Sequence, residues 1–103
     1  MRFTDFNLAP PLQSGIDTAG YQTPTPIQQQ AIPAILKGGD VMGLAQTGTG
    51  KTAAFALPIL HRLLDGPRGR VRALIIAPTR ELAEQIHQSI TTLANGTSLR
   101  RMT

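Results

Sequence analysis

The chain has 103 residues, which is enough for at most one small domain. Its net charge of +4 suits a polyanionic partner, but an excess of this size does not identify one. Because there is no cysteine, disulfides and thiolate metal sites are excluded and a reducing compartment is expected. The first residues reach Asp5 without the apolar stretch of a secretory signal, so we expect a soluble, cytoplasmic protein.

A first short helix is predicted from Pro10 to about Gly20. Proline suits the first helical turn, because its fixed φ is already helical and its missing N–H is not needed there. Leu12 and Ile16 recur at helical spacing, and Gly20 stands where a helix end favours glycine.

A second helix is predicted to begin after Thr25. Thr25 reads as the N-cap and Pro26 as the first helical residue, and Gln28 stands at the position that completes a capping box. We expect a kink or break at Pro33 and an end at Gly38-Gly39.

The next segment combines a strand, a glycine-rich stretch and a helix. Residues 40–44 predict a short apolar strand, and glycines follow it up to Gly50. A largely apolar helix is predicted from Lys51 to Asp65, with a kink at Pro58.

The remaining elements continue the alternation of strands and helices. Residues 72–77 predict a buried strand, Thr79 is placed to cap a helix that reaches about Leu93, and residues 97–103 predict a third strand. This order predicts an α/β fold, a parallel sheet with flanking helices and right-handed crossovers. The loops that follow parallel strands lie at one edge of the sheet, where ligands of such folds bind.

The stretch from Ala45 to Thr52 has the pattern of a phosphate-binding loop, with Ala in place of the usual first glycine. Gly48 and Gly50 allow the backbone N–H groups to point at phosphate oxygens. Lys51 would face the β- and γ-phosphates of a nucleotide, and the Thr52 hydroxyl would bind Mg²⁺. The nucleotide-binding residues predicted here are Ala45, Gln46, Thr47, Gly48, Thr49, Gly50, Lys51 and Thr52, and the last two are also the predicted catalytic residues.

Two further stretches narrow the class of nucleotide-binding protein. Residues 20–28 read Gly-Tyr-Gln-Thr-Pro-Thr-Pro-Ile-Gln, with the aromatic Phe3 seventeen residues before them, and residues 78–83 read Pro-Thr-Arg-Glu-Leu-Ala. Together with the phosphate loop, and in this order and spacing, they resemble the Q motif and the PTRELA motif of DEAD-box RNA helicases. The resemblance covers essentially the whole chain and implies the first, RecA-like P-loop domain of an ATP-dependent RNA helicase.

The resemblance implies that Gln28 selects adenine, and hence ATP or ADP, and that Phe3 and Tyr21 stack on the base. An amide can pair with both N6 and N7 of adenine, and aromatic rings offer flat faces for stacking. A structural alternative remains open, in which Gln28 only completes the capping box and both aromatic residues belong to the core.

The resemblance also implies that Pro78, Thr79, Arg80 and Glu81 contact the RNA backbone. A helix N-terminus with an arginine is suited to phosphate. Alternatively, Thr79 caps the helix and Glu81 interacts with its positive end, and we expect both roles to hold.

Other charged and titratable residues are predicted to have no site of their own. The arginines at positions 68, 70 and 72 read as a solvated basic loop, and Glu84 reads as helix surface. His61 and His87 lack the spacing of a metal or nucleophile site and read as structural or surface residues.

The sequence departs from the family by containing no Asp-Glu-Ala-Asp motif and no two adjacent acidic residues. Hydrolysis needs carboxylates for Mg²⁺ and for the attacking water, so we expect this incomplete domain to bind nucleotide without turnover while the parent protein is an enzyme. Residues 1–38 would be its Q-motif segment and residues 39–103 its P-loop region. A different P-loop enzyme or a non-catalytic binding fragment are the alternatives. We also expect a homodimer, formed either through an exposed sheet edge or by exchange of residues 97–103 between two chains.

Overall fold

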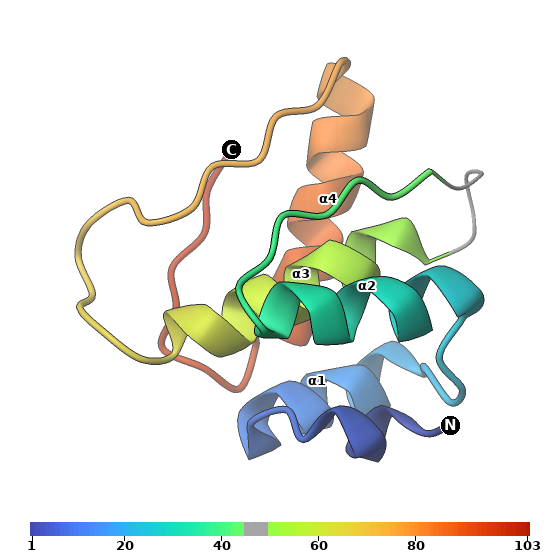
Figure 1. The fold of residues 1–103 in the computed structure, drawn as a ribbon. Helices are drawn as coiled ribbons and strands as arrows, with labels where there is room; N and C mark the ends of the chain where they lie inside the picture. Colours follow the sequence, from blue (N-terminus) through green and yellow to red (C-terminus); the bar gives the residue numbers. More distant parts are fainter. Residues whose placement is uncertain (45–49) are drawn as a thin grey trace.

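The computed structural model describes residues 1–44 and 50–103, and this part of the chain contains one short 3₁₀ helix and four α-helices (Figure 1). None of these helices is long and apolar enough to cross a membrane. In chain order the elements are η1 (Phe3–Phe6), α1 (Pro10–Ala19), α2 (Pro26–Leu36), α3 (Lys51–Leu63) and α4 (Arg80–Leu93).

Local signals set the helix ends as the sequence predicts. The helix α1 begins at Pro10 and ends at Ala19, and its C-cap residue Gly20 has a left-handed φ of 80°. At the start of α2, Thr25 and Gln28 form the reciprocal capping box, and the helix continues without a break through Pro33. Such caps provide partners for backbone N–H groups that a helix leaves unpaired at its first turn.

The predicted parallel sheet is wrong for the described residues, because none of them forms a strand. The three predicted strands, 40–44, 72–77 and 97–103, are irregular segments in the described part (Figure 1). A strand is stable only when a neighbour pairs with its backbone N–H and C=O groups, and apolar residues alone do not supply that neighbour.

The side chains of the first two of these segments remain largely exposed. The apolar run at residues 72–77 predicts burial on both faces, whereas Leu74 is 81% exposed and Ile76 is 84% exposed. Met42 and Leu44, which precede the phosphate loop, are exposed to 89% and 88%. Both segments therefore have apolar side chains that no other described residue covers.

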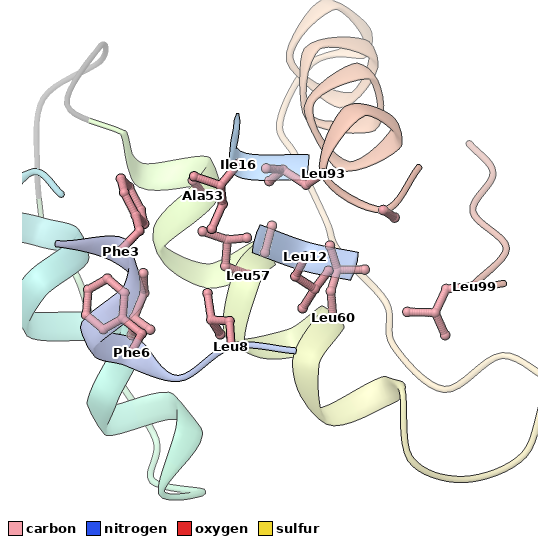
Figure 2. Close-up of a cluster of buried hydrophobic side chains, with 13 residues drawn as sticks. Phe3, Phe6, Leu8, Leu12, Ile16, Ala53, Leu57, Leu60, Leu93 and Leu99 are labelled. Atoms are coloured by element: carbon pink, nitrogen blue, oxygen red, sulfur yellow. The ribbon is translucent and has the colours of Figure 1, made fainter. Parts of the chain in front are cut away.

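The hydrophobic core lies between η1, α1, α3 and the C-terminal end of α4, and α2 contributes the buried Ile32 (Figure 2). Leu12 and Ile16 of α1, Leu57 of α3 and Leu93 of α4 are buried almost completely. Gly15 lies close to the end of α4, since a Cβ atom there would overlap the carbonyl oxygen of Leu93. The absence of a side chain at this position thus allows α1 to approach α4.

A side chain of α3 also holds the start of α1. The backbone N–H of Ala9, the N-cap residue of α1, donates to Nδ1 of His61 at 3.1 Å. This long-range bond satisfies one of the N–H groups at a helix start that has no side-chain cap of its own. His61, which the sequence predicts to be a structural or a surface residue, thus has a structural contact.

Candidate nucleotide site

The described end of the predicted phosphate loop, Gly50, leads directly into α3. Gly50 is the N-cap residue, and Lys51 and Thr52 are the first two residues of the helix. Lys51 is exposed and Thr52 is half-buried. Since a glycine cap has no side chain, it leaves the first N–H groups of α3 for another acceptor, and an anion suits this end of a helix. Residues Ala45, Gln46, Thr47, Gly48 and Thr49 lie outside the described residues.

Gln28 joins the Q-motif segment to the first turn of α3. Its side chain is only 3% exposed. The amide Oε1 accepts from the backbone N–H of Thr25 at 3.0 Å, and Nε2 donates to the carbonyl oxygen of Gly50 at 3.1 Å. The capping box is thus confirmed, while adenine selection stays a prediction. An amide has two N–H groups and two oxygen lone pairs, and these two bonds use one of each, so one N–H and one lone pair remain for a further partner.

Gly50 fits this junction for two separate reasons. Its φ of 84° lies in the left-handed region that residues with a side chain rarely adopt. In addition, a Cβ atom at Gly50 would overlap Nε2 of Gln28 and would lie 3.2 Å from Oγ1 of Thr25. Glycine is therefore required both by the backbone conformation and by the close approach of α2.

The two aromatic residues predicted to stack on a base are stacked on each other. The ring centroids of Phe3 and Tyr21 lie 6.1 Å apart, with 24° between the ring planes. Phe3 is only 3% exposed, whereas Tyr21 is half-buried. Phe3 also meets Phe6 edge to face, at 5.9 Å between ring centroids. The structure thus brings the two predicted residues together, with Phe3 in the core and Tyr21 at its margin.

The motif at Pro78, Thr79, Arg80 and Glu81 forms the exposed start of α4. The side chain of Thr79 accepts from the backbone N–H of Leu82 at 3.1 Å, so the predicted cap is confirmed. Within residues 1–44 and 50–103, no hydrogen bond connects this motif with Gln28 or Lys51. It is therefore a second helix start, separate from that of α3.

The arginines of the loop after α3 include two residues whose role the sequence prediction missed. Arg72 donates to the carbonyl oxygens of Leu63 and Asp65 at 2.8 and 2.7 Å. Arg68 donates to the carbonyl oxygen of Leu64 at 3.2 Å. Both residues are exposed, as a solvated basic loop requires, but they also bind carbonyl groups at the end of α3. The available signal was their position just after a helix end, where carbonyl groups lack partners and attract cations.

Comparison with known proteins agrees with the motifs. The family described as DEAD/DEAH box helicase matches residues 25–103. The chain is 54% identical over 93 residues to the ATP-dependent rRNA helicase rrp3 of Sclerotinia sclerotiorum, covering 90% of this chain and 19% of that protein. It is 51% identical over 100 residues to the DEAD-box ATP-dependent RNA helicase 28 of Oryza sativa subsp. japonica, covering 95% of this chain and 12% of that protein.

A solved structure supports the same relationship. The crystal structure of the RNA-helicase Prp28 from Chaetomium thermophilum bound to ADP matches with a TM-score of 0.84 and 40% sequence identity. The match covers 92% of this chain and 24% of that one, so the chain spans less than a quarter of the length of each of these relatives. With a family match over residues 25–103 and identities above one half, the chain belongs to the DEAD/DEAH box helicase family.

Proposed function

We propose that the chain is the adenine-nucleotide-binding segment of an ATP-dependent RNA helicase, and that on its own it binds nucleotide without turnover. The observation that carries the proposal is the bond from Gln28 Nε2 to the Gly50 carbonyl oxygen, at 3.1 Å. It joins the residue expected to read the base to the helix start expected to hold the phosphates. The relative of known structure, Prp28, is bound to ADP.

At the phosphate end, the residues of the first turn of α3 fit an anion. The N–H groups of this turn have no cap side chain as acceptor, and the exposed Lys51 adds a positive charge. Lys51 would contact the β- and γ-phosphates, and the hydroxyl of Thr52 would be one of the oxygen ligands that Mg²⁺ takes together with phosphates. The metal, when bound, would neutralise charge on the phosphate oxygens.

At the start of α4, we propose that Thr79 and Arg80 contact the phosphates of RNA. The exposed guanidinium of Arg80 and the N-terminal end of a helix of 14 residues both favour anions. Contacts of this kind position a protein on a nucleic acid without reading its bases. The proposed RNA contact is therefore independent of sequence.

Calorimetric titration of Mg·ADP tests the phosphate contacts. The substitution Lys51→Ala removes a charge-assisted contact and should weaken binding about ten- to a hundred-fold. Lys37→Ala is the matched control, because Lys37 is also exposed but caps the C-terminal end of α2. Equal affinities of the wild type and Lys51→Ala would refute the proposed phosphate site.

Titration of GDP beside ADP tests the role of Gln28. Adenine presents a donor at N6, whereas guanine presents an acceptor at O6, so the wild type should prefer ADP. Gln28→Ala should remove this preference. Thr25→Ala is the control for the capping box, because it removes the cap hydroxyl and retains the amide. Equal binding of ADP and GDP by the wild type would contradict base selection by Gln28.

A further inference from the structure

We infer that Asn95 is a site of spontaneous chemical modification. Its side chain closes a ring onto the backbone nitrogen of Gly96, and the chain then reopens as an aspartyl or an isoaspartyl link. Asparagine is one of the thermolabile residues of proteins. Its reactivity at a given position depends on how free the side chain is and on the residue that follows.

The turn after α4 presents this pair of residues to the solvent. Asn95 and Gly96 are both exposed, whereas Ala94 before them is completely buried. Thr97 closes the turn, because its backbone N–H and its hydroxyl donate to the carbonyl oxygen of Ala94 at 2.9 and 2.7 Å. Two anchored residues therefore hold the ends of a turn whose central pair points away from the protein.

The backbone nitrogen of Gly96 is the nucleophile, and the turn leaves it available. Within residues 1–44 and 50–103, neither the N–H of Gly96 nor the side-chain amide of Asn95 has a hydrogen-bond partner. The backbone N–H groups on either side, those of Asn95 and Thr97, are both bonded. In addition, glycine has no Cβ atom that would stand between its nitrogen and the side chain of Asn95.

The reaction needs only water as a further reagent. The nitrogen of Gly96 forms a bond to Cγ of Asn95 and the bond from Cγ to Nδ2 breaks. The proton of the Gly96 N–H leaves with the released group as ammonia, and a five-membered succinimide ring remains. Water that adds at Cγ opens the ring to aspartate. Water that adds at the backbone carbonyl carbon opens it to isoaspartate, in which the main chain runs through the former side chain.

The products weaken the packing of α4 on α1. Both add a negative charge just beyond the C-terminal end of α4, where the helix dipole already places negative charge. Isoaspartate also adds one carbon to the main chain next to Gly96. There is little room for it, because a Cβ atom at Gly96 would lie 3.3 Å from the carbonyl oxygen of Pro11, at the start of α1. The turn also directly follows Leu93 and Ala94, which belong to the core.

Incubation of the folded chain in mildly alkaline buffer, followed by peptide mapping with mass spectrometry, tests the inference. Asn95 should gain the mass that the replacement of NH₂ by OH brings, and an enzyme that methylates isoaspartyl groups should label the same peptide. Asn7, the other asparagine of the chain, is an internal control. It is also exposed, but Leu8 follows it, and a side chain at that position hinders the attack. Loss at Asn7 that equals or precedes loss at Asn95 would overturn the inference.

A variant and an unfolded reference sharpen the test. Asn95→Gln keeps an amide at the same place but would have to close a larger ring, so the isoaspartyl label should disappear. Labelling of the same peptide in this variant would refute the role of Asn95. The wild type unfolded in urea gives the rate that the local sequence alone supports, and the folded chain should react at a similar rate. A folded chain that reacts more than about ten-fold more slowly would show that the turn protects the site, and the inference would fail.

Thermal unfolding measures the consequence for the fold. The isoaspartyl form, separated by chromatography, should have a lower Tm than the unmodified chain. Asn95→Asp, which has the charge but a main chain of normal length, should lie between the two. Equal Tm values of the isoaspartyl and the unmodified chain would refute the effect on the packing of α4 against α1.

Discussion

The contact between Gly15 and the end of α4 predicts the effect of adding a single methyl group. In Gly15→Ala, the new Cβ atom would overlap the carbonyl oxygen of Leu93 and would lie 2.8 and 2.9 Å from its carbonyl carbon and Cα. Comfortable carbon contacts are about 3.5–4.0 Å, so α1 would have to move by about 1 Å relative to α4. Backbone atoms within a helix cannot rotate aside, as the end of a flexible side chain could.

The expected loss of stability follows from two opposing effects. Overpacking of a buried site costs about 1–3 kcal/mol, while alanine favours a helix over glycine by about 1 kcal/mol. Because the displacement also disturbs the buried Leu12, Ile16 and Leu93, we expect the upper part of the overpacking range, about 2–3 kcal/mol. The net destabilisation should then be about 1–2 kcal/mol. For a domain of this size, each 1 kcal/mol lowers the Tm by about 4–8 °C.

Thermal unfolding followed by far-ultraviolet circular dichroism measures this loss. Ser14→Ala is the matched control, because Ser14 is the exposed neighbour of Gly15 in α1 and gains helix propensity without a clash. We expect the Tm of Gly15→Ala to fall by roughly 5–15 °C and that of Ser14→Ala to stay near the wild type. A Gly15→Ala variant as stable as the wild type would refute the close packing of α1 on α4.

Three further predictions concern the surface. Arg72→Ala should lower the Tm by several degrees, because Arg72 donates hydrogen bonds to carbonyl groups at the end of α3. Arg70→Ala should leave the Tm unchanged. Equal Tm values of the two variants would contradict the role of Arg72. Arg80→Ala should weaken binding of single-stranded RNA, measured by fluorescence anisotropy at several salt concentrations, more than Arg70→Ala does. The reverse order would place the RNA contact elsewhere. The wild type should self-associate through the exposed apolar side chains of residues 72–77, and the double variant Leu74→Lys/Ile76→Lys should be monomeric. Light scattering after size exclusion measures both. A wild type that is monomeric at every concentration would contradict the predicted homodimer.

The sequence predicted those features that depend on a few adjacent residues. Thr25 and Thr79 were identified as caps because a hydroxyl at this position accepts from an N–H two or three residues later, and both caps are present. Gly20 ends α1 for an equally local reason. The motifs likewise identified the family without any knowledge of the packing.

Features that depend on distant residues were not predicted. The apolar run at residues 72–77 was interpreted as a buried strand, yet burial and pairing require neighbours that local sequence cannot supply, and none of the described residues provides them. The bonds of Arg72 to Leu63 and of His61 to Ala9 also depend on how the chain returns to α3. For the same reason, the sequence could not distinguish the buried Phe3 from the half-buried Tyr21.

The bonds of Gln28 make the junction of α2 with α3 dependent on an intact amide group. Oε1 accepts from Thr25 and Nε2 donates to the Gly50 carbonyl, so the two ends of the amide have opposite hydrogen-bonding character. Deamidation converts Nε2 into a carboxylate oxygen, which can only accept. The first bond would survive, while the second would become a repulsion between two oxygens in a buried place, with a negative charge beside the first turn of α3. Spontaneous loss of one amide group would thus weaken the junction between α2 and α3 without any change in the gene.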